Sequence, residues 1–268
     1  MKQAFYSYKK RKKMANLNRN GVNIHYETYG EGQVVFLTHG FSATSKMWYN
    51  QIESLSENYC LVIWDMRGHG ATDYPDDINL YNEQETVADI FFILDELGVK
   101  EATIGGMSLG GYMSLAFYRQ YPDRVNSLLI IDTGPGFKNE TARKGWNDYA
   151  LSTAEKFEQT GLESLIGRSK EMDPKNHSNA KGLSLAARGM LTQHDDRIIN
   201  SLPEISVPSL IIVGEHDKDF LAAADYMERK IKGSKKVVIP DAGHAVNIDQ
   251  PEIFNQTLNK FLKGISAF

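Results

Sequence analysis

The chain has little cysteine and no long apolar run. Cys60 is its one cysteine among 268 residues, so no intrachain disulfide can form. No apolar run approaches the ~20 residues of a membrane-spanning helix, and the first residues lack the apolar stretch of a secretory signal. A chain of this length buries enough surface to fold without a disulfide or a structural metal. We therefore expect a cytoplasmic globular protein that binds no membrane.

Acidic residues outnumber basic residues outside the first part of the chain. Residues 1–13 hold six Lys and Arg and no acid, so the remainder carries a net charge of −10, against −4 for the whole chain. An acidic body disfavours nucleic-acid binding, which depends on cationic side chains. The basic segment has little apolar surface to bury. We predict that residues 1–16 form a disordered extension; contact with an anionic membrane or nucleic acid is the alternative.

Short apolar runs alternate with segments of helical periodicity. Apolar runs predict buried strands, and apolar residues spaced by three and four predict helices. The predicted strands are 22–29, 34–39, 60–66, 101–107, 125–133, 208–215 and 236–242. The predicted helices are 45–58, 82–97, 109–121 and 251–262. This alternation indicates an α/β fold with a mostly parallel sheet flanked by helices.

The alternation is interrupted at residues 134–202. This stretch shows only a loose helical pattern, and it is too long for a plain loop in a compact domain. We interpret it as a helical cap over the carboxyl-terminal edge of the sheet, where open α/β sheets bind ligands. The core is then formed by residues 17–133 and 203–268. Trp146 and Met190 are the candidate pocket residues of the cap.

The most specific motif is Gly106-Met107-Ser108-Leu109-Gly110, which lies between a predicted buried strand and a predicted helix. In this context G-x-S-x-G places a serine on a sharp, strained turn, and the glycines relieve the crowding there. The serine hydroxyl then projects above the sheet, beside the positive end of the helix dipole. Ser108 is the candidate nucleophile.

A serine nucleophile requires a general base and a group that orients the base. His244 follows the last predicted strand, and Asp217 follows the strand before it, which gives the chain order Ser, Asp, His. Asp132 ends an earlier strand at the same edge and is the alternative acid. Glu215 and Asp219 are neighbouring acids that we expect at the solvated surface. We predict a triad of the serine with His244 and Asp217.

Two glycine-containing turns follow earlier strands. The segment 39–41 (His-Gly-Phe) ends a predicted strand, so the backbone N–H of Phe41 is a candidate oxyanion-hole donor, together with that of Leu109. We expect the His39 side chain to be structural. The turn 65–70 (Asp-Met-Arg-Gly-His-Gly) holds no group placed to react, so we expect it to provide charge pairing and a chain reversal.

Together these motifs resemble a known family. From about residue 21 to residue 262, the motifs resemble the successive signatures of the α/β-hydrolase superfamily. They are H-G-F followed by Trp48, then D-M-R-G-H-G, G-M-S-L-G, G-E-H-D and D-A-G-H. The chain is similar to the esterase, enol-lactonase, perhydrolase and carbon–carbon hydrolase group. The resemblance implies the helical cap and the absence of a cofactor or metal. Epoxide hydrolases and haloalkane dehalogenases of this fold use an aspartate nucleophile, so Ser108 argues against both activities.

These motifs favour hydrolysis of a carboxylic ester or lactone through an acyl-enzyme intermediate, with a small-molecule ester or lactone as the expected substrate. They do not specify an oligomeric state. One alternative is a carbon–carbon hydrolase or lyase-like synthase of the same fold, in which Arg143, Arg168 or Arg188 could hold a substrate carboxylate. Another alternative is a small-molecule receptor of the same fold, because such a receptor can keep its triad.

Overall fold

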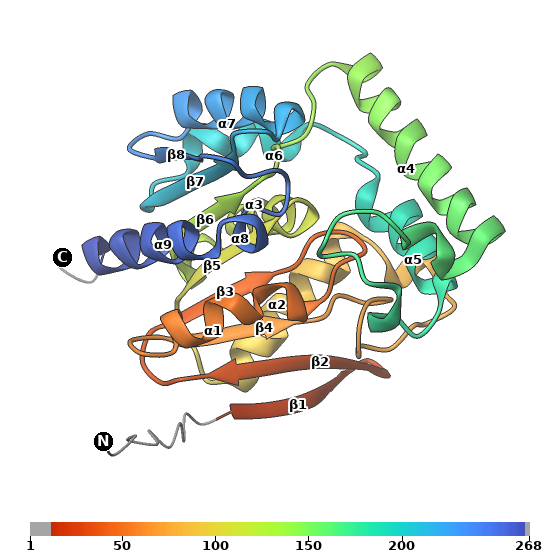
Figure 1. The fold of residues 1–268 in the computed structure, drawn as a ribbon, viewed down its shortest axis with the longest axis horizontal. Helices are drawn as coiled ribbons and strands as arrows, with labels where there is room; N and C mark the ends of the chain where they lie inside the picture. Colours follow the sequence, from red (N-terminus) through yellow and green to blue (C-terminus); the bar gives the residue numbers. More distant parts are fainter. Residues whose placement is uncertain (1–11, 266–268) are drawn as a thin grey trace, which may run out of the picture.

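An eight-stranded sheet runs through the computed structural model, which describes residues 12–265 (Figure 1). The strand order is β1-β2-β4-β3-β5-β6-β7-β8. Pairing is antiparallel for β1 with β2 and for β2 with β4, and parallel for every other pair. The strands are β1 (Lys12–Arg19), β2 (Val22–Tyr29), β3 (Val34–Thr38), β4 (Cys60–Trp64), β5 (Ala102–Met107), β6 (Val125–Ile131), β7 (Ser209–Gly214) and β8 (Lys235–Ile239).

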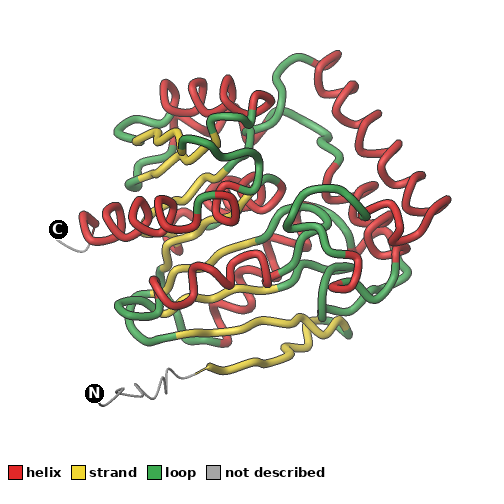
Figure 2. Tube along the Cα trace, in the orientation of Figure 1, coloured by secondary structure: helices red, strands yellow, loops and turns green. Residues whose placement is uncertain are grey.

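Helices cover both faces of this sheet, with α1, α8 and α9 on one face and α2, α3 and α7 on the other (Figures 1 and 2). Adjacent strand residues therefore enter different apolar clusters: Phe36 packs on the α2–α3 side and Leu37 on the α1–α9 side. The helices are α1 (Tyr49–Leu55), α2 (Glu83–Glu96), α3 (Leu109–Gln120), α4 (Glu140–Thr160), α5 (Ala180–Ala186), α6 (Arg197–Ser201), α7 (Lys218–Lys230), α8 (Val246–Asp249) and α9 (Pro251–Ile265). The predicted α/β architecture is confirmed.

The antiparallel edge differs from the prediction. Residues 12–16, which we expected in a disordered extension, belong to β1 and pair with β2 along its length. Asn20 and Gly21 between the strands have φ of 53° and 85°. Both values fit the two-residue hairpin turn that Asn-Gly favours, so this dipeptide is the sequence signal for the hairpin. Residues 1–11 of the expected extension lie outside the described residues.

The turn 65–70 after β4 is tied to α2 by a buried ion pair. Arg67 donates from Nε and Nη2 to the two carboxylate oxygens of Asp89, at 2.7 and 2.8 Å, and neither side chain is exposed. Arg19 of β1 reaches the same carboxylate at 2.7 Å and Glu85 at 2.6 Å. The charge pairing expected of this turn is therefore present, and through Arg19 it also connects the edge strand β1 to α2.

Between β6 and β7 the described chain contains helices and no strand. The helical segment 134–202 comprises α4, α5, α6, short 3₁₀ turns at Gly161–Leu165 and Pro174–Asn176, and a π turn at Ala187–Leu191. In Figure 1, α4 and α5 lie beyond one end of the sheet strands. None of the described helices is long and apolar enough to cross a bilayer.

We expect Arg67→Met to lower the free energy of unfolding by about 3 kcal/mol, because the Asp89 carboxylate would remain buried without its bidentate partner. Urea titration followed by far-UV circular dichroism measures this change. The matched control is Lys144→Met, which removes an exposed pair with Asp148 and should cost less than about 1 kcal/mol. Equal losses in the two variants would contradict the structural role of the buried pair.

Candidate active site

Ser108 occupies a strained turn between β5 and α3. Its φ of 55° and ψ of −118° are rare for a residue with a side chain. The flanking glycines permit the turn: a Cβ on Gly106 would lie 2.4 Å from the Gly110 carbonyl carbon, and one on Gly110 would lie 2.3 Å from the Thr38 carbonyl oxygen. Only glycine therefore allows α3 to start this close to β3 and β5.

His244 and Asp217 meet at the same edge of the sheet. Asp217 follows β7 and is buried, His244 follows β8, and His244 Nδ1 lies 2.8 Å from Asp217 Oδ2. The imidazole also stacks on Phe220, with ring centroids 5.1 Å apart. A carboxylate on Nδ1 fixes the tautomer in which Nε2 can accept a proton.

The three predicted triad residues line one cavity, which we call the central cavity. Within residues 12–265 no hydrogen bond joins the Ser108 hydroxyl to the His244 ring. Catalytic hydrogen bonds in ligand-free sites are often long and tighten only when substrate binds. The structure thus brings Ser108, Asp217 and His244 together without a closed Ser–His contact.

Asp132, the alternative acid, lies deeper and has a different partner. It is 1% exposed, and its Oδ1 accepts a hydrogen bond from the Gly214 N–H at 2.8 Å. Burial, assisted by the nearby charge of Asp217, raises the pKa of Asp132 well above its usual value. Asp132 therefore joins the end of β6 to β7, while Asp217 contacts the imidazole.

The two candidate oxyanion donors belong to residues that line the same cavities as the serine. Leu109 is the first residue of α3, so its N–H has no acceptor within the helix. The Phe41 N–H has no acceptor among the described residues. Gly40 and Phe41 line the central cavity with Ser108, and Leu109 lines the adjoining cavity. Both amides remain available to an anionic oxygen.

The loop after β3 is held by buried imidazoles. The ring of His39 donates from Nδ1 to the Gly40 carbonyl at 2.7 Å and accepts at Nε2 from the Met66 N–H at 2.9 Å. The ring of His69 packs 5.0 Å from it and accepts from the Ser42 N–H at 3.2 Å. The structural role expected for the His39 side chain is confirmed.

A third imidazole joins this stack from the helical segment 134–202. The His177 ring lies 5.9 Å from that of His69, and its Nε2 lies 3.0 Å from the Ser42 carbonyl oxygen. The sequence gives no periodicity or motif around His177 that places it here. His177 therefore links the helical segment to the loop that carries the Phe41 amide.

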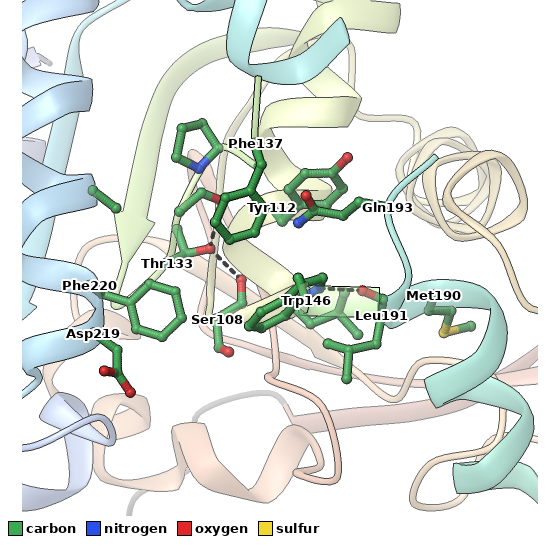
Figure 3. A pocket seen from close by; sticks show the side chains of 15 residues that line it. Ser108, Tyr112, Thr133, Phe137, Trp146, Met190, Leu191, Gln193, Asp219 and Phe220 are labelled. Carbon is green, nitrogen blue, oxygen red and sulfur yellow. Dashed lines mark hydrogen bonds between the residues drawn. The ribbon is translucent and has the colours of Figure 1, made fainter. Parts of the chain in front are cut away.

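An apolar cavity adjoins Ser108, and we call it the side cavity (Figure 3). Trp146 and Met190, the predicted pocket residues, both line it. Its other lining side chains include Leu109, Tyr112, Phe137, Leu191, Gln193 and Phe220. The walls therefore come partly from the sheet edge and partly from the helical segment 134–202.

Among the described residues, neither cavity has a lysine or arginine in its lining. The three arginines of the helical segment 134–202 that we considered as carboxylate-binding groups have other partners. Arg143 donates to the Phe137 carbonyl at 3.1 Å, Arg168 to the Ser164 carbonyl at 2.9 Å, and Arg188 pairs with Glu158 at 2.9 Å. The acidic side chains of the two linings are the carboxylates of Glu171, Asp217 and Asp219.

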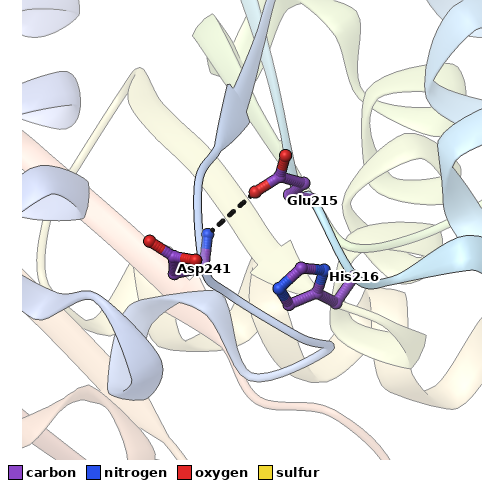
Figure 4. Close-up of side chains that lie close together, drawn as sticks. All are labelled: Glu215, His216 and Asp241. Carbon is purple, nitrogen blue, oxygen red and sulfur yellow. Dashed lines mark hydrogen bonds between the residues drawn. The ribbon is translucent and has the colours of Figure 1, made fainter.

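Glu215, His216 and Asp241 lie close together beside the ends of β7 and β8 (Figure 4). Their potential ligating atoms lie within 4.8 Å of one another, and all three residues are exposed. Glu215 Oε2 already accepts a hydrogen bond from the Asp241 N–H at 3.1 Å. Exposed acidic groups of this kind do not by themselves define a metal site.

We expect the free energy of unfolding to fall as pH drops from about 6.5 to about 4. Burial lowers the pKa of His39 to about 4 and also lowers the pKa values of His69 and His177. The unfolded chain, with histidine pKa values near 6.5, therefore takes up protons first. The stability that depends on the neutral rings is complete above about pH 6.5 and is lost through this window.

Urea unfolding at pH 7.5 and at pH 5 measures this loss. His69→Gln should show a smaller fall between the two pH values than the parent, because one buried ring no longer titrates. His194→Gln, at an exposed position, is the control and should keep the parental fall. If the His69 variant lost as much free energy of unfolding between the two pH values as the parent, the role assigned to the buried His69 ring would be contradicted.

Comparison with known proteins identifies the family to which the chain belongs. A family model described as the alpha/beta hydrolase fold matches residues 33–190. The chain is 30% identical to 3-oxoadipate enol-lactonase 1 of Acinetobacter baylyi, over 92% of this chain and 96% of that protein. It is 28% identical to a Bacillus subtilis protein that is a candidate 2-succinyl-6-hydroxy-2,4-cyclohexadiene-1-carboxylate synthase, over 90% of this chain and 96% of that protein.

A solved structure of a thermophilic esterase from Thermogutta terrifontis, with malate bound, superposes with a TM-score of 0.78 at 27% identity. The match covers 95% of this chain and 99% of the esterase. The sheet, the Ser108 turn and these similarities agree, and the chain belongs to the α/β hydrolase fold family.

Proposed function

We propose that this protein hydrolyses a carboxylic ester or lactone, with Ser108 as nucleophile, His244 as general base and Asp217 as the orienting acid. One observation carries the proposal: Asp217 holds His244 Nδ1 at 2.8 Å in the cavity onto which the strained Ser108 opens. The names of the enol-lactonase and esterase relatives support the same reaction class.

In the first step Ser108 Oγ attacks the substrate carbonyl carbon while His244 Nε2 takes the hydroxyl proton. The carbonyl oxygen becomes an oxyanion, which the backbone N–H groups of Phe41 and Leu109 stabilise. When the carbonyl reforms, the bond to the leaving oxygen breaks, and that oxygen takes the proton from His244. The products are an acyl-serine and an alcohol, or the hydroxyl end of an opened lactone.

In the second step water replaces the alcohol. His244 takes a proton from the water as the water oxygen bonds to the acyl carbon, and the same two amides stabilise the second oxyanion. Collapse then breaks the bond to Ser108 Oγ, which recovers its proton from His244. Asp217 remains ionised and stabilises the imidazolium in both steps. The carboxylic acid product leaves a regenerated serine.

We infer an uncharged acyl group for the substrate. Both cavities lack cationic lining among the described residues, and Asp219 and Glu171 contribute carboxylates. An anionic acyl group would meet repulsion without a compensating ion pair. The helical segment 134–202 supplies Phe137, Trp146 and Met190 to the acyl side, so we assign it as the cap that shapes this pocket.

The similarity to the Bacillus subtilis candidate synthase favours a second function, a lyase-like synthase or carbon–carbon hydrolase. The cap arginines expected to hold a carboxylate in that chemistry lie outside the cavity linings. A receptor of the same fold would bind without turnover. Hydrolysis of p-nitrophenyl acetate and butyrate distinguishes the esterase from both alternatives.

We expect Ser108→Ala to lower kcat for p-nitrophenyl butyrate by ~10⁴–10⁶-fold, because no other group on the turn can form the acyl intermediate. The matched control is Ser127→Ala, which changes a buried serine near the start of β6, at the opposite end of the strand. It should keep parental turnover. Retention of a tenth of the activity by the Ser108 variant, with an unchanged melting curve, would refute the nucleophile.

Replacing each of the two buried carboxylates, Asp217 and Asp132, by asparagine should have different effects on turnover and stability. Asp217→Asn should lower kcat by ~10³–10⁴-fold, because the imidazole loses the partner that sets its tautomer. Asp132→Asn should cost mainly stability, at most about 1–2 kcal/mol, through its hydrogen bond to Gly214. Steady-state kinetics and urea unfolding of both variants check this. A collapse of turnover in the Asp132 variant alone would reverse the assignment.

A further inference from the structure

The side cavity contains several polar side chains, and most of them have a partner elsewhere in the protein (Figure 3). The Tyr112 hydroxyl donates to Glu83 at 3.2 Å. Thr133 Oγ1 donates to the Ser108 carbonyl at 2.6 Å, and the Trp146 indole N–H donates to the Leu191 carbonyl at 2.7 Å. These groups therefore present mainly their carbon atoms to a ligand.

Besides the half-buried Ser108 and the exposed Asp219, Gln193 is the exception, and its side chain is buried. Its side chain is 9% exposed, and Oε1 has no hydrogen-bond partner among the described residues. Figure 3 shows the carboxamide next to Tyr112, on the cavity side and directed toward Phe137. A buried amide without a partner lowers stability unless a ligand completes it.

The position of Gln193 is fixed by its surroundings. Asn147 of α4 accepts from the Gln193 N–H and donates to its carbonyl, each at 2.8 Å. Gly136 closes the opposite side, with φ of 89°, and a Cβ there would lie 2.9 Å from Gln193 Oε1. A residue with a fixed backbone, a confined side chain and one unpaired polar atom has the properties of a preorganised binding group.

We propose that Gln193 is a specificity-determining residue that hydrogen-bonds an uncharged oxygen substituent, a hydroxyl or keto group, on the acyl part of the substrate. This inference rests on the proposed function, because it takes the substrate carbonyl to lie at Ser108. The carboxamide can donate from nitrogen or accept at oxygen, so it suits either group.

The surroundings of Gln193 favour a hydroxyl or keto substituent over a plain alkyl chain and over a carboxylate. A plain alkyl chain would fill the apolar walls but leave the Gln193 amide desolvated and unpaired. A carboxylate would approach Asp219 in a lining without lysine or arginine among the described residues. Sites built around a buried hydrogen-bonding group discriminate strongly against ligands that lack its partner.

The test compares ester pairs matched in chain length. The p-nitrophenyl esters of 4-oxopentanoate and pentanoate, and of 5-oxohexanoate and hexanoate, are measured with the parent and with Gln193→Met, which keeps side-chain length and removes the amide. The parent should favour the keto ester of at least one pair by ~10-fold or more in kcat/KM. The Met variant should reduce that ratio to about one or below, and its rate on the alkyl ester should not fall.

Tyr112→Phe is the matched control, because it removes a cavity-lining hydroxyl that is bonded to Glu83; it should change both members of a pair alike. Gln193→Glu is the second variant in case the Met variant does not fold; its carboxylate should also abolish the keto preference. No keto preference in the parent, or its persistence in either Gln193 variant, would overturn this inference while ester turnover continues. Absence of any ester turnover by the parent would instead refute the proposed function.

Discussion

The turn at Ser108 is the constraint on which the rest of the site depends. Its positive φ requires α3 to begin almost in contact with β3 and β5, and Gly106 and Gly110 provide the necessary space. The same turn places the Leu109 amide at the start of a helix and directs Ser108 toward the edge where the loops after β3, β7 and β8 converge. Parallel strands make that convergence obligatory, since their carboxyl ends share one edge.

Much of the core could be predicted from the sequence because its strands are buried on both faces. Strands such as β4 and β6 are nearly continuous apolar runs, and α2 ends where Gly98 follows its last apolar turn. The strand β1 was not predicted, because Lys13, Asn16 and Asn18 are exposed and leave only a weak apolar pattern along the strand. The Asn20-Gly21 turn was the available signal. The helix α7 was not predicted either, although Ala224 and Met227 have a helical spacing.

The candidate site shows the same division between regular and irregular structure. Ser108, Asp217 and His244 follow regular strands, so their order along the chain predicts a shared edge. Asp132 also follows such a strand, and the structure distinguishes the two acids by their partners: Asp132 accepts from the Gly214 N–H, whereas Asp217 contacts His244. Gln193 belongs to a segment without periodicity, and its backbone partner Asn147 is 46 positions away, so no local pattern identifies it.

The helical segment 134–202 acts on both sides of the serine. Through His177 it contacts Ser42 in the loop that carries the Phe41 amide, and through Trp146 and Gln193 it forms the wall of the side cavity. The Ser108 turn itself is fixed by glycine contacts and backbone hydrogen bonds within the sheet and α3. Side chains of the segment can therefore differ without altering that turn, which would let the proposed reaction geometry serve different acyl groups. The link through His177 limits this freedom, because a displacement of the segment would also move the loop that carries Phe41, the proposed oxyanion donor.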